Sequence, residues 1–482
     1  MSKISLTTTL PYVNADPHVG HALEFVQADV VARYNRLLGN EVFFNTGTDE
    51  HGLKIYRKAQ EEGKTPQDYT DEYAERFKGL IGHLNLSFDA FIRTTDPKHK
   101  KAAQEFWKRC NENGDIYKKE YKVKYCVGCE LEKTDSELVD GKCPEHPTTP
   151  IETIEEENYF FKFSNYQEKL LDLYKEHPDF VVPAHRLNEI RSFVERGLKD
   201  FSISRLKSKM PWGVPVPDDE EHVMYVWFDA LVNYVSTLDW PASAEATAGK
   251  PGTFYEWWPS IQFAGKDNLR QQSAMWQAML MSAGIAPSKQ ILIHGFINSG
   301  GQKMSKSIGN VIDPIELSDK YGTDALRYFL LRHVNPFEDT DLTSELIEDV
   351  YTANLVNGLG NLVSRVMKLA ETHLDESKIE KPVVGKPPRE YHEAITGYEF
   401  NKAADYVWKR IGAVDQRITD EEPYKVVKTD PEKGKQIIKE LTVEVFKIGL
   451  LLSPFMPDTG VRIIDSVLAN KKPENLFPRI EK

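Results

Sequence analysis

The sequence lacks long hydrophobic runs and has very little cysteine, and each absence excludes a class of protein. No stretch approaches about 18 consecutive apolar residues, so no membrane-spanning helix is predicted. The N-terminus, MSKISLTTTLPY, lacks the apolar core of a signal peptide, and we expect a cytoplasmic protein. Four cysteines in 482 residues are too few for a disulfide scaffold.

An excess of basic residues is also missing. The net charge of −13 argues mildly against a nucleic-acid binder, because phosphate contacts come from lysine and arginine. A large protein can still gather basic residues on one face, so charge does not decide the partners. The content of 40% apolar and 28% charged residues is typical of a globular protein. The length predicts about two to four structural units, and no internal repeat is present.

The first 50 residues predict a strand, a helix and a second strand. Residues 4–10 are rich in β-branched residues, and apolar positions recur at helical spacing from about Gly20 to Leu38. A second strand is predicted from Glu41. This order is typical of a parallel α/β sheet with a nucleotide-binding crevice at its strand ends.

Further strands are predicted at 222–231, 261–267 and 290–297, after a segment of short strands and turns around the cysteines. From about Ser344 onward the pattern is almost wholly helical. The simplest interpretation is one α/β domain interrupted by an inserted domain and followed by a helical region.

The sequence His18-Val-Gly-His21 opens the first predicted helix. The N–H groups and the dipole at a helix N-terminus favour bound phosphate, and two imidazoles can donate hydrogen bonds to it. Gly20 permits close approach of the ligand. Two surface histidines near a helix cap are the alternative interpretation.

A second basic motif, Lys303-Met-Ser-Lys306-Ser, follows Ser299-Gly300-Gly301. Two lysines on a Gly-rich loop can neutralise charge that develops on a triphosphate. A solvated basic turn is the alternative, but the pairing with HxGH favours phosphate chemistry.

Three of the cysteines form a pattern typical of a metal site. The spacings Cys126-x-x-Cys129 and Cys143-x-x-His146 put two ligands on each of two tight turns. Three thiolates and one imidazole can close a tetrahedral Zn²⁺ site that has no open position, which predicts a structural ion. Unrelated free cysteines are the alternative.

The HxGH and KMSKS motifs together resemble the signature pair of class I aminoacyl-tRNA synthetases. Other stretches resemble the methionyl-tRNA synthetase family in particular: TLPYVNADPHVGH (9–21), TDEHG (48–52), YVWFDALVNY (225–234), AGKDNLR (264–270) and HGFINSGGQKMSKS (294–307). Members of that family carry a zinc-binding insertion at the place of the cysteines, some with a Cys₃His ligand set.

The resemblance implies ATP-dependent activation of L-methionine, with Mg²⁺, and transfer to the terminal adenosine of the initiator and elongator methionine tRNAs. It implies catalytic roles for His18, His21, Lys303 and Lys306. It further implies ATP contacts from Gly20, Gly265, Asp267 and Ser305, and methionine contacts from Leu10, Tyr12, Asp49, Trp227, Ala230, Tyr234 and Gln272.

Two positions depart from the family pattern. Gln272 stands where many relatives have a histidine, and Tyr424 stands where they have a tryptophan that stacks on an anticodon base. Asn361 and Arg365 match family residues that contact the anticodon.

The resemblance also implies a domain plan: a Rossmann-type parallel sheet domain with an inserted zinc-binding domain, and a C-terminal all-α bundle. We expect residues 1–115 and 221–295 to form the two halves of the catalytic domain, and 116–220 the insertion. We expect 296–343 to carry the KMSKS and stem-contact region, and 344–482 the anticodon-binding domain. The sequence ends about where the anticodon-binding helices should finish, whereas some members of the family continue into a dimerisation module, so we expect a monomer.

Three alternative functions fit this sequence less well. Valyl, leucyl and isoleucyl enzymes carry a large editing insertion for which this chain has no room, and the cysteinyl enzyme holds zinc in its amino-acid pocket. A non-catalytic tRNA-binding protein would not need two phosphate-handling motifs. A small-molecule nucleotidyltransferase would not need the long helical region.

Overall fold

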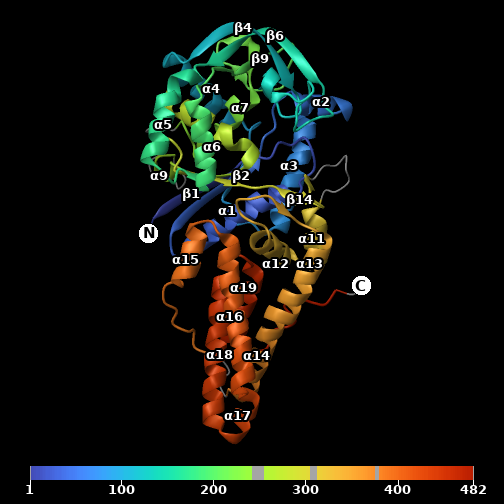
Figure 1. Cartoon of the computed structure of the whole chain (residues 1–482), viewed down its shortest axis with the longest axis vertical. Helices are drawn as coiled ribbons and strands as arrows, with labels where there is room; N and C mark the ends of the chain where they lie inside the picture. The colour runs from blue at the N-terminus through green and yellow to red at the C-terminus, as the bar shows by residue number, and fades with distance from the viewer. Residues whose placement is uncertain (1, 242–253, 304–311, 375–378, 481–482) are drawn as a thin grey trace. The chain divides into compact units, whose positions relative to one another are not determined.

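The structure of the chain is a computed structural model that describes residues 2–241, 254–303, 312–374 and 379–480 (Figure 1). The chain divides into two compact units, each built from segments that are distant in sequence. The first unit holds Met1–Asp16, Gly39–Gly79 and Phe88–His294, and the second holds Pro17–Leu38, Leu80–Ser87 and Gly295–Lys482.

A parallel sheet of six strands forms the centre of the first unit, in the order β3-β2-β1-β12-β13-β7. Strand order proceeds outward from β1 on one side and from β12 on the other, so the carboxyl ends of these two strands form a switch point. This confirms the predicted Rossmann-type sheet. Its strands are β1 (Lys3–Thr8), β2 (Glu41–Thr48), β3 (Ala90–Arg93), β7 (Val181–Val182), β12 (Ile261–Gly265) and β13 (Gln290–His294).

The cysteine region of the first unit is a small antiparallel sheet in the order β5-β4-β6-β8. Strand β4 (Ile116–Cys126) pairs along its whole length with β6 (Ile151–Phe161), and β5 (Leu131–Lys133) and β8 (Phe201–Ser202) flank them. The β4–β5 turn carries Cys129, and the connection from β5 to β6 carries the other turn of the cysteine motif.

The strand predicted at 222–231 is wrong beyond Met224. Strand β11 (Asp219–Met224) pairs with β9 (Ser204–Leu206) and β10 (Pro215–Val216), and the chain then forms helices α7 (Val226–Ala230) and α8 (Asn233–Ser236). A short apolar run does not distinguish a buried strand from a buried helix. Partners that are distant in sequence decide this case, because Asp229 of α7 is bonded to two histidines from elsewhere in the unit.

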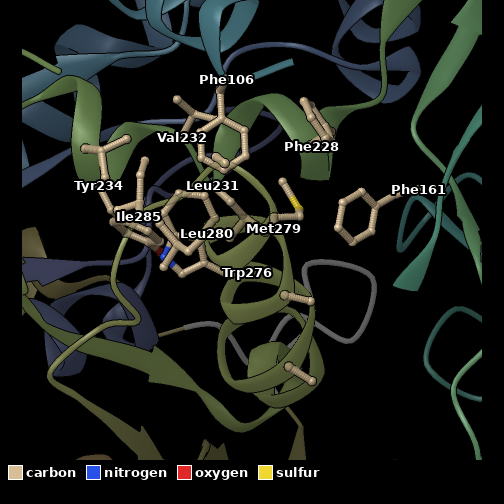
Figure 2. Packing of buried hydrophobic residues seen from close by; sticks show 14 of the residues in the cluster. Phe106, Phe161, Phe228, Leu231, Val232, Tyr234, Trp276, Met279, Leu280 and Ile285 are labelled. Atoms are coloured by element: carbon tan, nitrogen blue, oxygen red, sulfur yellow. The ribbon is translucent and has the colours of Figure 1, made fainter. Parts of the chain in front are cut away.

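The main core of the first unit packs helix α4 (Pro97–Glu112) against α7, α8 and α10 (Trp276–Ser282), as Figure 2 shows. The rings of Phe106 and Trp276 stack at 5.5 Å, and Trp276 meets Tyr234 edge to face at 5.8 Å. Because α8 contributes Tyr234, the core holds in place one of the residues predicted to contact methionine. The other helical segments are α2 (Leu53–Glu61), α3 (Pro66–His83, whose last turn belongs to the second unit), α5 (Gln167–Glu176), α6 (Ala184–Glu195), α9 (Phe254–Trp257) and a π-helical turn, Gln271–Met275.

The second unit is mostly helical, and long helices α16, α18 and α14 run together in it (Figure 1). This confirms the helical region predicted from about Ser344. Its helices are α1 (Val19–Leu37), α11 (Pro314–Tyr321), α12 (Thr323–Tyr328), α13 (Ser344–Val350), α14 (Asn361–His373), α15 (Arg389–Thr396), α16 (Phe400–Glu421), α17 (Pro423–Thr429), α18 (Pro431–Leu452) and α19 (Pro457–Leu468), with π-helical segments Phe329–His333 and Tyr351–Gly360. A small sheet adds β14 (Ile297–Ser299), β15 (Gln302–Lys303) and β16 (Thr340–Asp341). Within the described ranges, no helix is both long enough and apolar enough for a membrane crossing.

A fully buried arginine joins several segments of the second unit. The guanidinium of Arg327, on α12, lies 2.7 Å from the carboxylate of Asp29 on α1. Its N–H groups also donate to the carbonyl oxygens of Leu84, Pro454 and Phe455, at 2.8 to 3.0 Å. Helix α1 is therefore fastened to the segment between α18 and α19 through one buried cation.

Candidate active site and metal centre

Tyr12 and Asp49 lie beside each other at the carboxyl ends of β1 and β2. Their backbones form a parallel bridge, in which the Asp49 N–H donates to Pro11 and the Val13 N–H donates to Asp49. Leu10, half-buried, occupies the same loop after β1. The sheet therefore brings together three of the residues predicted to contact methionine.

Asp49 is a buried carboxyl group in an acidic environment. Burial, and then the carboxylates of Asp229, Glu50 and Glu130, raise its pKa well above the usual value. Glu50 already has a partner, since Arg93 binds it through two hydrogen bonds of 2.6 and 2.9 Å. Burial also raises the pKa of Tyr12 well above its usual value, so this phenol remains a hydrogen-bond donor. An unbalanced buried carboxylate is suited to receive a cation such as a substrate ammonium.

Aromatic residues of α7 and α8 extend this region. Trp227 is half-buried, and its indole N–H has no hydrogen-bond partner in the described part of the chain. Ala230 and Tyr234 are buried. Gln272, in the π-helical turn after β12, donates from Nε2 to the Tyr234 hydroxyl at 2.7 Å. Gln272 therefore contacts a predicted pocket residue directly.

A buried aspartate between two histidines lies next to the aromatic residues. One carboxylate oxygen of Asp229 lies 2.9 Å from Nδ1 of His51, and the other lies 3.1 Å from Nε2 of His99. His99 also contacts Ser236 at 3.0 Å. Burial opposes ionisation of Asp229, but both histidines outweigh it and hold its pKa below the usual value. The sequence alone did not predict this group, because its members come from three distant segments; His51 of TDEHG and Asp229 of YVWFDALVNY were the local signals.

The four predicted metal ligands converge. The ligand atoms of Cys126, Cys129, Cys143 and His146 all lie within 4.8 Å of one another. The sulfurs of Cys129 and Cys143 are 4.0 Å apart. A tetrahedral Zn²⁺ holds thiolates at about 2.3 Å, which separates two sulfur ligands by about 3.8 Å. The donor set and its spacing fit a bound metal ion of that kind.

The turns of this centre are shaped for their ligands. A Cβ at position 128 would lie 2.5 Å from Cγ of His146, so Gly128 leaves the space that this ring occupies. Burial opposes ionisation of Cys143, but backbone N–H groups of Glu145 and His146 outweigh it and lower the pKa of its thiol. Burial raises the pKa of Cys129, and a bound cation would stabilise its thiolate.

His18 and His21 cap the first turn of α1 in the second unit. Nδ1 of His18 accepts from the Gly20 N–H at 3.1 Å, and Nδ1 of His21 accepts from the His18 N–H at 3.2 Å. The two rings stack at 3.8 Å. Because each Nδ1 is an acceptor, the neutral rings carry their protons on Nε2, which makes Nε2–H the donor of each ring. Gly20 is needed here, since a Cβ would lie 2.9 Å from Cε1 of His18.

The other basic motif is only partly described. Lys303 ends β15, while Ser305 and Lys306 lie outside the described residues, as does the side chain of Lys303. The carbonyl of Ile312, the first described residue after this gap, accepts a hydrogen bond from the Val19 N–H at 3.3 Å. The chain that follows KMSKS is therefore bonded to the start of the HxGH helix.

Gly265 and Asp267 lie at the carboxyl end of β12, at the switch point of the sheet. Asp267 is exposed, and a Cβ at Gly265 would lie 2.8 Å from its Oδ1. Because Gly265 has no side chain, the Asp267 carboxylate fits beside the strand end, and its exposure leaves it accessible to a ribose hydroxyl.

The predicted anticodon residues lie on two helices of the second unit. Asn361 is exposed, and it lies one helical turn before Arg365 on α14. Arg365 forms an ion pair with Asp415 of α16 at 2.5 Å. Tyr424, on α17 at one end of the helices (Figure 1), is 41% exposed, and its hydroxyl donates to Glu422 at 3.1 Å. An exposed ring of this kind can stack on a base.

Comparison with known proteins shows which family the chain belongs to. A family model described as tRNA synthetases class I (M) matches residues 4–150 and 146–367. A methionine–tRNA ligase of Thermotoga maritima is 40% identical over 98% of this chain and 76% of its own length. One from Mesorhizobium japonicum is 38% identical over 99% of this chain and 98% of its own length.

Solved structures agree with the sequence relatives. The Mycobacterium tuberculosis methionyl-tRNA synthetase in complex with methionyl-adenylate superposes with a TM-score of 0.88 at 36% identity, covering 96% of this chain and 94% of that one. The ligand-free form of the same enzyme gives a TM-score of 0.84 at 32% identity, covering 100% and 99% of the two chains.

Proposed function

Because this chain belongs to the methionine–tRNA ligase family of class I tRNA synthetases, we propose that it activates L-methionine with ATP and transfers the methionyl group to methionine tRNAs. The observation that carries the assignment of the substrate is the backbone bridge between Tyr12 and Asp49. It puts an electrostatically unbalanced carboxylate beside an aromatic ring, which suits an ammonium group next to an apolar side chain.

In the first step, the methionine carboxylate attacks the α-phosphorus of ATP in line, and pyrophosphate leaves with Mg²⁺. The carboxylate is already nucleophilic, so the protein contributes position and charge rather than a covalent intermediate. Asp49 binds the ammonium group of methionine, which would supply a counter-charge to a carboxyl group whose pKa is raised by burial and by neighbouring carboxylates. In the second step, a ribose hydroxyl of the terminal adenosine of the tRNA attacks the carbonyl carbon of the methionyl-adenylate, an ester to the tRNA forms with loss of the hydroxyl proton, and AMP leaves.

The phosphates of ATP are bound by HxGH and KMSKS. His18 and His21 donate from Nε2, which the acceptor role of both Nδ1 atoms supports. Lys303 and Lys306, with Ser305, stabilise the charge on the departing pyrophosphate. On the nucleoside side, Gly265 permits close approach, and Asp267 binds the ribose of ATP.

Methionine is selected by an apolar pocket made of Leu10, Tyr12, Trp227, Ala230 and Tyr234. One methylene group changes affinity by only about 1–3 kcal/mol, so selectivity needs contacts to the thioether as well. Sulfur next to aromatic rings is favourable, and these positions supply three such rings. Gln272 replaces the histidine found in many relatives and orients Tyr234 through the hydrogen bond at 2.7 Å.

The Cys₃His centre holds one structural Zn²⁺. When bound, the ion supplies folding energy on the order of 10 kcal/mol to a segment with little core of its own. Four protein ligands leave no open coordination position, which supports a structural rather than a catalytic ion.

The C-terminal helices bind the anticodon through Asn361, Arg365 and Tyr424. We retain the domain plan from the sequence as part of this proposal, with 1–115 and 221–295 as the catalytic halves, 116–220 as the insertion, 296–343 as the KMSKS and stem-contact region and 344–482 as the anticodon-binding domain. A monomer in the cytoplasm completes the proposal.

The decisive experiment is pyrophosphate exchange into ATP, without tRNA, with each of the twenty amino acids. Exchange with methionine alone is expected. Exchange with another amino acid would retain the class I family but reject methionine as the substrate. If a folded, zinc-containing sample gives no exchange with any of them, the proposed adenylation is wrong as stated.

A further inference from the structure

We infer that Glu130 is a positioning residue for methionine binding, through which the Cys₃His centre holds Tyr12 in the amino-acid pocket. This inference rests on the function proposed above. It assigns to Glu130 no contact with substrate, only the orientation of a residue that contacts it.

Glu130 directly follows Cys129, and its carboxylate is buried in the first unit. One oxygen accepts from the Tyr12 hydroxyl at 3.1 Å and from the Lys54 backbone N–H at 2.8 Å, and the other accepts from the Tyr125 hydroxyl. A carboxylate that is buried needs such donors, because an unpaired one would be costly. Glu130 therefore cannot move without breaking its bonds to three segments.

These three donors come from different parts of the candidate site. Tyr12 belongs to the loop after β1, Lys54 lies in the first turn of α2 just after TDEHG, and Tyr125 lies in β4. A fourth bond involves the backbone, since the Tyr225 hydroxyl donates to the carbonyl of Glu130. Tyr225 immediately precedes α7, which carries Trp227. Glu130 is thus bonded to the loop after β1, to the segment after β2 and to the segment that leads into α7, each of which carries residues of the proposed pocket.

The backbone at two glycines makes this arrangement possible. Gly52 has φ of +111°, and a Cβ there would collide with the Tyr12 hydroxyl and lie 3.3 Å from Oε1 of Glu130. Gly128, inside the Cys126-x-x-Cys129 turn, offers its carbonyl to the Lys54 ammonium at 3.1 Å. Lys54 therefore makes two bonds here: its backbone N–H donates to Glu130, and its ammonium group donates to the carbonyl of Gly128.

Apolar packing joins the same parts. Tyr125 and Val127 of the metal turn form one buried cluster with Tyr225 and Val226, and Tyr12, Leu53 and Trp227 pack against it. Glu130 itself adopts a left-handed backbone conformation, φ +53°, which the surrounding bonds must maintain. An ion that fixes Cys126 and Cys129 would fix this backbone, and with it the hydroxyl of Tyr12.

The test compares Glu130→Gln, Tyr12→Phe and the double variant with wild type, as full-length zinc-loaded protein. Asp135→Asn is the matched control, because Asp135 lies between Cys129 and Cys143 in the sequence but is exposed and pairs with Lys124. The readouts are the dissociation constant for methionine by calorimetry, KM for methionine and for ATP in pyrophosphate exchange, zinc per chain and the unfolding temperature. We chose glutamine because it keeps the shape of the side chain and one acceptor oxygen.

We expect Glu130→Gln to weaken methionine binding about tenfold, as loss of one hydrogen bond to a charged group implies, with KM for ATP and the zinc content unchanged. Both changes remove the same hydrogen bond between Tyr12 and Glu130. The double variant should therefore bind methionine no more weakly than whichever single variant has the lower affinity. Additive effects, or wild-type methionine binding in Glu130→Gln, would refute the inference and leave the proposed function intact. A wild-type protein that binds no methionine would refute both.

Discussion

Replacing Asp49 with asparagine should move stability and activity in opposite directions. The side chain is buried, and the charged groups that raise its pKa further are other carboxylates, so ionisation of Asp49 costs free energy when no cation is bound. Asparagine has the same shape and no charge. The backbone bridge to Tyr12 does not use the side chain, so the loop after β1 should be unchanged.

The expected sizes differ between the two readouts. Removing a strained charge at a functional site typically adds about 1–2 kcal/mol to the free energy of unfolding. Loss of a hydrogen bond to a charged ammonium costs about 1.5–3 kcal/mol of binding, which raises the dissociation constant for methionine about 10- to 150-fold.

The stability gain should also depend on pH. The pKa of Asp49 is higher in the folded than in the unfolded protein, so its contribution to stability is fully present below the unfolded pKa and is lost as pH rises through the folded pKa. Asparagine does not titrate. The variant should therefore match wild type in acid and exceed it increasingly as the pH rises.

Urea unfolding of the ligand-free proteins at several pH values, together with calorimetric titration of methionine, tests both effects. Asp135→Asn, which removes an exposed carboxylate, is the control for a general effect of charge. An Asp49→Asn protein that is less stable than wild type at neutral pH, or an advantage that shrinks as pH rises, would contradict the electrostatic argument. Unchanged methionine affinity would show that Asp49 does not bind the ammonium group.

Three other changes have defined outcomes. Cys143→Ser should release zinc and unfold the cysteine region, since the ion supplies on the order of 10 kcal/mol; metal analysis and circular dichroism check this, and retained zinc would contradict it. Arg327→Met should lower the free energy of unfolding by about 3–5 kcal/mol, because it leaves Asp29 with only Arg33 of its two arginine partners and leaves three buried carbonyl groups without their donor; denaturant midpoints measure this, and a neutral effect would mean that the pair is dispensable. Arg365→Ala should raise KM for tRNA and leave pyrophosphate exchange unchanged. The control Lys368→Ala, on the same helix, should leave both KM for tRNA and pyrophosphate exchange unchanged.

The elements predicted correctly from the sequence are those whose signals lie within a few neighbouring residues. The first strand, the HxGH helix and the second strand were predicted within about two residues of β1, α1 and β2, because a run of β-branched residues and apolar residues at helical spacing are both short-range signals. The Cys₃His cluster followed from two short spacings, each of which makes a turn on its own.

Features that depend on distant partners were not predictable in this way. The segment 222–231 is a short apolar run like that of a buried strand, yet Asp229 pairs with His51 and His99 from distant parts of the sequence and α7 forms instead. Glu130 looked like one more charged residue after a cysteine, because three of its four partners lie outside its own hairpin. Only the fold reveals such contacts.

The π-helical turn that carries Gln272 also limits how this region can evolve. Such a turn holds one residue more than an α-helical turn in the same length of axis, so a deletion there could be absorbed by closing the turn into a regular helix. The helix on either side would keep its facing, because the turn loses only the residue that widens it, but the side chains within the turn would be displaced. Trp276 could keep its stacking on Phe106, whereas Gln272 would lose its place beside Tyr234. Length polymorphism is therefore expected to be rarer here than substitution, and libraries that aim to accept methionine analogues should vary residue identity at this turn while preserving its residue count.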